Sequence, residues 1–482
     1  KEFIMNHFLC KTKIVATIGP ACRSKEKVRG LIQAGMDVAR LNFSHANHEE
    51  HLENINTIRA VNQELGTEVA LMLDTKGPEI RTHNFENGVA TLKKGNMVRI
   101  AMKEVLGTTE KFSVTHASLI HDVEVGNILL VDDGNLTLQV LSKDFNNQEL
   151  ICLIENNATL KNRRGINVPS VKLSLPFLSE QDKKDLVFGC ENEVDFVAAS
   201  FVSSAEDIIE MRRFLKEHGG EGIQIIAKIE NTMGIRNFDE ILSVADGIMV
   251  ARGDLGVEIP IHEVPIFQRS IVAKCHFANK PVIVATQMLE SMQYNSRPTR
   301  AEVNDVATAV LSGCDAIMLS GETASGLYPV ESVNTMNTIA FRMEEEINYK
   351  ELMSRAREAR VNDIASTIAL GVADAAQQLP ISAILTPTMS GFTARAVSHF
   401  RPKAPIIAVT MNRKVMRSLA LSWGVFPILA VLQDNFENVI QQAIKEANRK
   451  FAFTPGDMVI VTAGIPLNIA RTTNMMKIEI IK

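Results

Sequence analysis

Long hydrophobic runs are absent from the sequence, and so is an excess of charge of one sign. The longest apolar runs, such as VAASFV and GIMVA, are far shorter than the about 20 residues that a membrane-spanning helix needs. The 51 Lys and Arg residues stand against 56 Asp and Glu residues, a net charge of −5. Nothing overall therefore attracts the chain to nucleic acid or to an anionic membrane surface. We expect a cytoplasmic protein without nucleic-acid or membrane partners.

Cysteine is scarce, and its six copies are scattered without a C-x-x-C pair or a Cys/His cluster at zinc spacing. Disulfide frameworks and structural zinc are therefore not expected. The chain also lacks the glycine-rich Walker and Rossmann motifs, so any nucleotide binds without those loops. A G-x-S-x-G elbow is missing as well, and a Ser-His-Asp hydrolase is unsupported. With 46% apolar residues over 482 positions, the composition predicts a globular protein of about three domains.

What the sequence does contain is a repeated alternation of short apolar runs and longer amphipathic stretches. Eight such runs precede residue 324, and each is followed by a helical pattern. Runs that are apolar throughout are typical of parallel strands buried on both faces. Eight strand–helix units in series predict a (β/α)8 TIM barrel of the α/β class. The runs are 13–20, 37–44, 69–78, 196–202, 225–230, 247–254, 281–286 and 316–323.

Two further regions depart from this alternation. Between the third and fourth runs the helical period disappears, and short alternating strands with hairpin turns at Gly134-Asn135 and Asn146-Asn147 replace it. This predicts an inserted small β-barrel domain over 79–171, leaving a discontinuous catalytic barrel over 1–78 and 172–350. A second α/β series follows and predicts an open-sheet C-terminal domain over 351–482.

Polar side chains collect at the ends of the eight apolar runs, where TIM barrels place their catalytic residues. Lys228 and Glu230 lie two apart in a strand and therefore point to the same face. A single lysine at a strand end more often extends into water. Here, however, polar residues end the apolar runs of six of the eight strand–helix units, including that of Lys228. The set is Arg40, Asn42, Ser44, Asp74, Thr75, Lys76, Lys228, Glu230, Arg252, Asp254, Thr286, Ser320 and Glu322.

Glu230 and Asp254 offer two carboxylates from neighbouring strands without His or Cys, which suits a hard cation such as Mg²⁺; the alternative is a structural carboxylate pair. Four cationic side chains at the same rim suit a substrate that carries phosphate and carboxylate groups. Four further oxygen donors suit a monovalent cation, although each residue type is also a common cap or turn former. The cationic residues are Arg40, Arg81, Lys228 and Arg252, and the oxygen donors are Asn42, Ser44, Asp74 and Thr75.

In the C-terminal series, the segment 386–393 follows an apolar strand and precedes a helical pattern. Hydroxyl and backbone N–H groups gather there at a helix N-terminus, an arrangement that can cradle a phosphate. An ordinary turn capped by Ser390 or Thr393 fits the same residues equally well.

A series of motifs, ATIGPA, VARLNFSH, LDTKGPEIRT, AKIEN, VARGDLGVE, ATQMLESM, RPTRAEVNDVATAV and LSGETASGLYP, resembles pyruvate kinase over nearly the whole chain. The resemblance is to bacterial members without the extra C-terminal phosphohistidine-type domain. It implies phosphoryl transfer from phosphoenolpyruvate to ADP in glycolysis, giving pyruvate and ATP. It also implies Mg²⁺ (or Mn²⁺) and K⁺ as cofactors and a homotetramer. A start codon at Met5 would make residues 1–4 a remnant of cloning.

The resemblance assigns a role to each matching residue. Glu230 and Asp254 match the Mg²⁺ ligands, Lys228 and Arg40 match groups that contact the phosphoryl group, and Thr286 matches the site of enolate protonation. The backbone of Ala251, Arg252, Gly253 and Asp254 matches the cradle of the substrate carboxylate. Potassium is assigned to Asn42, Ser44, Asp74 and Thr75, and the nucleotide to Asn42, His45, Arg81 and Arg164.

Two single positions and one loop refine these expectations. The chain has Glu79 at a position where potassium-dependent members of the family carry Glu and potassium-independent members carry Lys. Met233 stands where the family usually has a polar or acidic residue, which puts the hydrogen bonding behind Glu230 in doubt. Thr388, Ser390, Gly391 and Thr393 match an effector-phosphate loop, and the effector is expected to be AMP or a sugar phosphate.

Two alternatives remain open on the sequence. Another Mg²⁺-dependent barrel enzyme acting on phosphoenolpyruvate would use the same groups without needing ADP. A lapsed kinase serving as a metabolite sensor would be expected to have lost Lys228, Glu230, Asp254 or Thr286, and all four are present.

Overall fold

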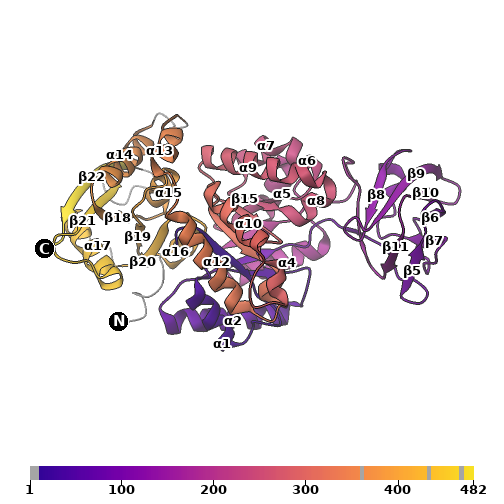
Figure 1. Cartoon of the computed structure of the whole chain (residues 1–482), viewed down its shortest axis with the longest axis horizontal. Helices are drawn as coiled ribbons and strands as arrows, with labels where there is room; N and C mark the ends of the chain where they lie inside the picture. Colours follow the sequence, from indigo (N-terminus) through magenta and orange to yellow (C-terminus); the bar gives the residue numbers. More distant parts are fainter. Residues whose placement is uncertain (1–9, 359–362, 431–435, 466–471) are drawn as a thin grey trace.

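The computed structural model describes residues 10–358, 363–430, 436–465 and 472–482. Residues 1–4 and the expected start at Met5 lie outside the described residues. Three bodies follow one another along the long axis of the molecule (Figure 1). The inserted domain lies at one end, the barrel in the middle and the C-terminal domain at the other end. No described helix combines the length and the apolar character needed to cross a membrane.

Eight parallel strands close into a barrel, which confirms the predicted TIM barrel. Every residue of six strands is buried, and in the other two only Asn42 and Gln224 are partly exposed, as continuously apolar strands require. Around the barrel the order is β1-β17-β16-β15-β14-β13-β3-β2. The strands are β1 (Lys13–Thr17), β2 (Val38–Asn42), β3 (Ala70–Asp74), β13 (Phe196–Ala199), β14 (Gln224–Ile229), β15 (Gly247–Ala251), β16 (Val282–Ala285) and β17 (Ala316–Leu319).

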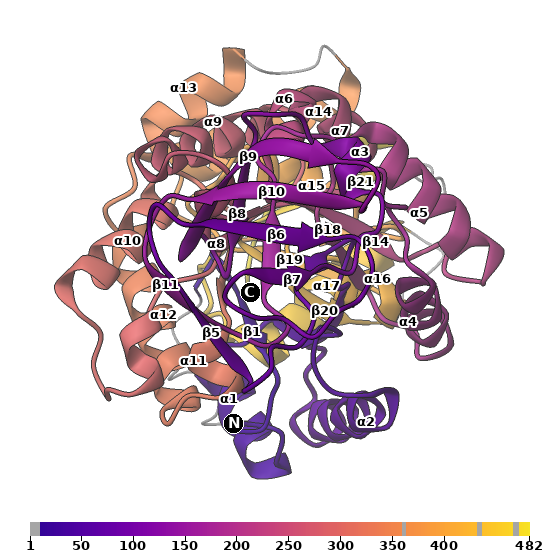
Figure 2. The same cartoon turned by 90° about the vertical axis from the view of Figure 1, so that its right-hand side faces the viewer.

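Helices cover the outside of the barrel and pack on its strands (Figure 2). Gly35, Gly219 and Gly313 follow helices and have positive φ angles, the left-handed conformation in which glycine commonly ends a helix. The helices are α1 (Lys25–Ala34), α2 (His48–Leu65), α4 (Glu180–Glu191), α5 (Ala205–Glu217), α6 (Thr232–Arg236), α7 (Phe238–Val244), α8 (Arg252–Glu258), η1 (Ile261–Glu263), α9 (Val264–Phe277), η2 (Glu290–Gln293), α10 (Arg300–Leu311), α11 (Gly321–Ala324) and α12 (Pro329–Glu344).

The inserted region forms a small β structure after β3, as predicted. Seven strands form one sheet in the order β4-β12-β8-β9-β10-β6-β7, and β5 pairs with β11 in a second one, so the insertion is a half-barrel; an isolated bridge between Thr82 and Val114 links residues next to the two end strands. The turns at Gly134 and Asn146 connect antiparallel neighbours, as the hairpin signals indicated. The elements are β4 (Ile80–Arg81), β5 (Val89–Leu92), β6 (Met97–Ala101), β7 (Lys111–Ser113), α3 (Leu119–Asp122), β8 (Ile128–Val131), β9 (Leu136–Asp144), β10 (Glu149–Ile154), β11 (Ala158–Lys161) and β12 (Gly165–Asn167).

The C-terminal region is an open sheet in the order β20-β19-β18-β21-β22, with β22 antiparallel to β21. Two residues that follow α16, Ala420 and Leu421, belong to the same buried cluster as the side chains inside the TIM barrel. The elements are α13 (Tyr349–Glu358), α14 (Ile364–Gln378), β18 (Ile381–Pro387), α15 (Phe392–His399), β19 (Ile406–Thr410), α16 (Arg413–Ser418), β20 (Val425–Leu429), α17 (Phe436–Phe451), β21 (Met458–Gly464) and β22 (Thr473–Ile480).

Candidate active site

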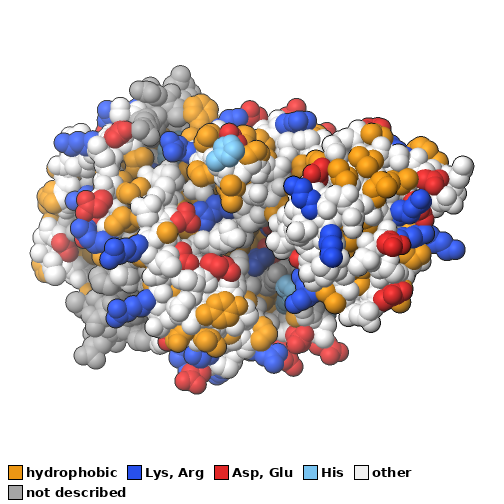
Figure 3. Space-filling view, turned by 45° about the vertical axis from the view of Figure 1, so that its right-hand side comes forward, with side chains coloured by type: hydrophobic (Ala, Val, Ile, Leu, Met, Phe, Trp, Pro, Cys, Tyr) orange, Lys and Arg blue, Asp and Glu red, His pale blue; other side chains and the backbone are white. Residues whose placement is uncertain are grey.

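The predicted site residues gather at the carboxyl ends of the barrel strands, on the side that faces the inserted domain. A cleft separates the two bodies there (Figure 3), and a cavity of about 220 Å³ extends between them. Glu79 and Asn167 line this cavity from the side of the insertion, and Phe201 and Asp254 line it from the barrel. Catalytic side chains of TIM barrels occupy this end.

Lys228 is the centre of a buried cluster of polar side chains. Its Nζ lies 2.9 Å from Glu230 Oε1 and 3.1 Å from Asp74 Oδ1, and it donates to Ser200 Oγ at 2.8 Å. Asp74 and Glu230 are each only 1% exposed. The ammonium group is thus held by three oxygen atoms from three different strand ends, so its position is fixed before any substrate arrives.

Arg40 reaches the same carboxylate from β2. Its Nε donates to Asp74 Oδ2 at 2.5 Å and its Nη1 donates to Thr17 Oγ1 at 2.9 Å. Burial would raise the pKa of Asp74, but the charges of Arg40 and Lys228 outweigh it and hold that pKa below its usual value. Asp74 therefore stays ionised and holds two cations side by side, which leaves the pair ready to face a multiply charged anion.

Glu230 and Asp254 are neighbours, and burial shifts the pKa of both carboxyl groups in the same direction. Burial raises the pKa of Glu230 to about 7; Lys228 opposes this shift and Asp254 adds to it. Burial also raises the pKa of Asp254. Two neighbouring buried carboxylates of raised proton affinity suit a hard divalent cation that removes their repulsion. Among the described residues, no group of three or more His, Cys, Asp or Glu offers a fuller metal site.

Ser200 and Phe201 are site residues that the sequence reasoning missed. Besides receiving the Lys228 hydrogen bond, Ser200 Oγ donates to the Thr75 carbonyl at 2.6 Å and lies 3.3 Å from Asp74 Oδ1. The backbone N–H of Phe201 donates to Glu230 Oε2 at 2.6 Å. The sequence does carry a signal for Ser200, because it is a polar residue near the end of the fourth apolar run, 196–202.

Thr286 faces the backbone at the start of α8. Its hydroxyl accepts a hydrogen bond from the Gly253 N–H at 2.8 Å and donates to the Ala285 carbonyl at 2.6 Å. The φ angle of Thr286 is 70°, a left-handed conformation that a β-branched residue rarely adopts. Such strain at a strand end is held in place by surrounding contacts and is typical of functional sites.

Arg252 differs from the expectation that its guanidinium meets the carboxylates at the rim. Both of its Nη atoms pair with Asp305 of α10 at 2.7 Å, and Nη2 also donates to the Thr286 carbonyl at 2.7 Å. The side chain therefore anchors the backbone of Ala251 to Asp254 instead of extending toward a substrate. Arg81 is likewise occupied, because it pairs with Glu79 at 2.7 Å.

The four expected potassium donors come from two adjacent strand ends. Asn42 and Asp74 are direct partners in the pairing of β2 with β3. Asn42 Oδ1 accepts from the Ser44 N–H at 3.1 Å, and Thr75 Oγ1 accepts from the Ser200 N–H at 3.1 Å. One carboxylate with neutral oxygens beside it suits a cation of low charge, so the donor chemistry fits.

The expected nucleotide residues lie on both sides of the cleft. Arg164 forms an ion pair with Asp132 at 3.3 Å inside the inserted domain, and its Nε is buried without a hydrogen-bond partner among the described residues. His45 is exposed on the barrel side, where its carbonyl accepts from the His51 ring at 3.0 Å. Both arginines, Arg81 and Arg164, therefore come from the inserted domain, and Asn42 and His45 come from the barrel.

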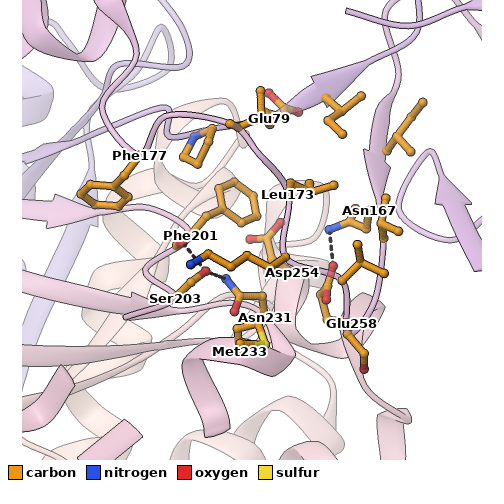
Figure 4. Close-up of a pocket in the computed structure, with 18 of the residues that line it drawn as sticks. Glu79, Asn167, Leu173, Phe177, Phe201, Ser203, Asn231, Met233, Asp254 and Glu258 are labelled. Atoms are coloured by element: carbon orange, nitrogen blue, oxygen red, sulfur yellow. Dashed lines mark hydrogen bonds between the residues drawn. The ribbon is translucent and has the colours of Figure 1, made fainter. Parts of the chain in front are cut away.

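Met233 lines the cavity between the bodies, as Figure 4 shows, together with Phe177 and Leu173. The Glu230 carboxylate is contacted by the Phe201 N–H and by Lys228. Neither of these contacts involves the side chain of Met233. Met233 makes the cavity wall more apolar and leaves those contacts intact.

The loop before α15 is ordered by its own hydrogen bonds. The Thr388 hydroxyl accepts from the Gly391 N–H at 2.9 Å, and Gly391, with φ 78°, precedes the helix. Thr393 shares a hydrogen bond with Thr473 at 2.7 Å. The interpretation that Ser390 or Thr393 caps this helix is therefore wrong, because the small, left-handed Gly391 takes the cap position.

Glu322, one of the predicted strand-end residues, contacts backbone groups of the barrel. Glu322 is 0% exposed and accepts from the backbone N–H groups of Leu289 and Ser320 at 3.1 and 2.8 Å. Glu322 thus connects the end of β17 to the segment after β16. A buried carboxylate is tolerated there because each of its two oxygens accepts a hydrogen bond from a backbone N–H.

Comparison with known proteins matches the same regions of the chain. A family model described as the pyruvate kinase barrel domain matches residues 9–333, and one described as the pyruvate kinase alpha/beta domain matches residues 366–479. A crystal structure of a pyruvate kinase from Cryptosporidium parvum superposes with a TM-score of 0.93. That structure is 39% identical, and the match covers 98% of this chain and 97% of that one.

Similar sequences agree with this result. A pyruvate kinase of Geobacillus stearothermophilus is 51% identical over 471 residues, covering 98% of this chain and 80% of the relative. One of Bacillus licheniformis is 50% identical over 472 residues, with the same coverage. These matches span both the barrel and the C-terminal sheet, and the site residues described above come from the matched segments. The chain belongs to the pyruvate kinase family.

Proposed function

We propose that this site transfers the phosphoryl group of phosphoenolpyruvate to ADP, with Lys228 as the central cationic group and with Mg²⁺ and K⁺ as cofactors. The observation that carries the proposal is the buried ammonium group held between Asp74, Glu230 and Ser200. The two carboxylates raise the pKa of Lys228 above its usual value, although burial would lower it. The group therefore keeps its charge throughout the reaction.

Phosphoryl transfer is accelerated mainly by positioning and by neutralising charge. Lys228 and Arg40 contact the phosphoryl group from one side, and Asp74 fixes both by accepting from each. The bond from phosphorus to the enol oxygen breaks as a bond to a β-phosphate oxygen of ADP forms. Lys228 then stabilises the negative charge that remains on the enolate oxygen.

Glu230 and Asp254 would hold Mg²⁺, which when bound orients phosphoenolpyruvate and neutralises its oxygens. Phe201 N–H keeps the Glu230 carboxylate oriented. The substrate carboxylate would lie against the backbone of Ala251 to Asp254, whose position Arg252 secures. Thr286 would bring the proton to the enolate carbon, through water, which completes pyruvate.

Potassium would bind to Asn42, Ser44, Asp74 and Thr75. The nucleotide would contact Asn42, His45, Arg81 and Arg164, so closure of the inserted domain would bring the latter two toward the barrel. We therefore assign a separate role to each domain. The catalytic barrel covers 1–78 and 172–350, the inserted lid covers 79–171, and the regulatory domain covers 351–482.

Regulation is proposed on the C-terminal side. AMP or a sugar phosphate would bind at Thr388, Ser390, Gly391 and Thr393 and activate the enzyme allosterically. The hydroxyls of Thr388 and Thr393 already bond within the protein, so effector binding would have to share or replace these contacts. The homotetramer and the cytoplasmic location stay predictions.

Lys228→Met tests the central proposal. Turnover should fall by about 10³-fold or more while phosphoenolpyruvate binding is largely kept, because the lost charge acts mainly in the transition state. Initial rates of pyruvate formation from phosphoenolpyruvate and ADP measure the effect. Lys216→Met, on a lysine that is 69% exposed, is the matched control. Near-normal turnover of Lys228→Met would remove Lys228 from the mechanism.

The potassium proposal has a separate test. Glu79 pairs with Arg81 beside the cleft, and Glu79→Lys would place a fixed positive charge there. We expect rates of this variant to depend less on K⁺ than those of the wild type. An unchanged K⁺ response would show that Glu79 has no part in the requirement.

A further inference from the structure

A second cavity, of about 560 Å³, lies on the opposite side of the molecule from the catalytic cleft, between the barrel and the C-terminal domain. The barrel contributes α2 and the segment that leads into β3. The C-terminal domain contributes α16, the end of β20 and the end of α17. None of the residues in the proposed effector loop 388–393 lines this cavity.

Its lining carries an excess of positive charge. Four cationic side chains, Arg59, Arg413, Arg417 and Lys450, face a single carboxylate, Glu68, among the described residues that line it. Glu68 is already shared, since it pairs with Arg413 and lies 3.3 Å from Arg417. Arg417 has a second partner outside the lining, Asp195, at 2.8 Å.

Arg59 and Lys450 form no ion pair with a carboxylate among the described residues. Arg59 donates to the carbonyl of Asn192 at 2.6 Å, and its charge is felt by Glu193 and Asp195, which it does not pair with directly. No described hydrogen bond or ion pair reaches Lys450, and burial lowers its pKa. A desolvated ammonium group without a counter-charge is costly to keep in a protein unless an anion binds it.

The remaining walls are apolar or amide-bearing. Ile58, Val69 and Leu71 come from the barrel, and Met416 comes from α16. Such a mixture of convergent charged groups on an apolar base is the composition of small-molecule sites. Guanidinium groups favour phosphate because they offer paired donors, and lysine adds a point charge.

We propose that this cavity binds a small phosphorylated metabolite between the barrel and the C-terminal domain. The phosphate would contact Lys450 and Arg413 from one body and Arg59 from the other. Binding would therefore fasten α17 and α16 to α2. This inference uses residues outside the catalytic site and does not rest on the roles proposed there.

Competitive acylation of lysines tests the site directly. The full-length protein is treated with limiting acetic anhydride, with inorganic pyrophosphate as the probe or with sodium chloride at equal ionic strength, and peptides are quantified by mass spectrometry. Pyrophosphate should slow the labelling of Lys450 about tenfold, as a one-unit rise in pKa would. Lys445, which is exposed on the same helix, is the internal control and should not change.

Two variants sharpen this result. Arg413→Gln should abolish the protection of Lys450. Lys450→Met should lose part of the thermal stabilisation that pyrophosphate gives the wild type, and Lys445→Met should keep all of it. The proposal is overturned if pyrophosphate slows Lys445 and Lys450 equally, or not at all. It is also overturned if Lys450 is unreactive in the free protein, because the cavity would then be closed.

Discussion

The two bodies attached to the barrel are fastened in different ways. The inserted domain meets the barrel across the catalytic cleft, where Asn167 of β12 donates to Glu258 of α8 at 3.1 Å. The side chains around this contact line a cavity, so the boundary is partly open. On the other side, Leu421 of the C-terminal domain is 1% exposed and joins the cluster inside the barrel.

Ion pairs reinforce the second attachment. Arg401 is 5% exposed, and its Nη2 lies 2.8 Å from Asp315 Oδ1 of the barrel. Arg417 pairs with Asp195 at 2.8 Å. Removing one partner of such buried pairs is far more costly than removing an exposed one. The inserted domain can therefore move without disturbing the hydrophobic core of the barrel. Movement of the C-terminal domain would instead require repacking of the cluster inside the barrel that contains Leu421.

Arg401→Met should have the largest effect on this comparison. It leaves the Asp315 carboxylate buried without its cation, which costs about 3–5 kcal/mol. The urea midpoint of unfolding should fall accordingly. Arg297→Met, on an exposed arginine, is the control, and equal midpoints for the two variants would show that the C-terminal attachment does not depend on this pair.

Leu421→Ala should follow, at about 2–5 kcal/mol, because it empties space at the base of the barrel. The matched control lies on the other attached body: Leu106→Ala removes a side chain that is 60% exposed in the inserted domain. Thermal unfolding measures both. If the two variants lose the same stability, the contrast between the two attachments fails.

A pH effect is expected next, from two histidines that meet across the C-terminal boundary. The rings of His276 and His399 stack at 5.0 Å. Burial, with the nearby Arg401 charge, lowers the pKa of His276 to about 3 and that of His399 to about 4. The unfolded chain, with a pKa of about 6.5, takes up protons first. The stability that the two neutral histidines contribute is therefore fully present above about pH 6.5 and is lost progressively as the pH falls toward 4.

Each histidine contributes at most about 1.4 kcal/mol per pH unit to this loss. His399→Phe should make the unfolding midpoint depend less steeply on pH between 6.5 and 4. His262→Phe, on a ring that is 78% exposed, should leave the slope unchanged. A slope that is the same in His399→Phe and the wild type would exclude the stacked pair as its source.

Asn167→Ala should have the smallest effect. It removes the hydrogen bond to Glu258, a loss of about 1 kcal/mol or less. We expect the unfolding midpoint to stay near the wild-type value and the KM for ADP to change by only a few fold. A loss of stability as large as that of Arg401→Met would mean that the inserted domain is held as firmly as the C-terminal domain.

Much of the fold was predictable because buried parallel strands are apolar throughout, and eight such runs leave few other architectures. The proximity of Lys228, Glu230 and Asp254 was also predictable, since the strand ends of a barrel converge on one face. The direction of Arg252 was not, because its partner Asp305 lies 53 positions away on α10. The cationic cavity could not be predicted either, since α2, α16 and α17 come to line the same cavity only through tertiary packing.

The closure of the barrel has a consequence for how the chain folds as it is synthesised. The Thr17 hydroxyl on β1 donates to the carbonyl of Leu319 on β17, 302 positions later. The first strand must therefore wait with one edge unpaired while most of the barrel emerges. The inserted domain contains all of its own sheet partners between β4 and β12. Because such local pairings form sooner than distant ones, we expect the inserted domain to be folded before the barrel has closed.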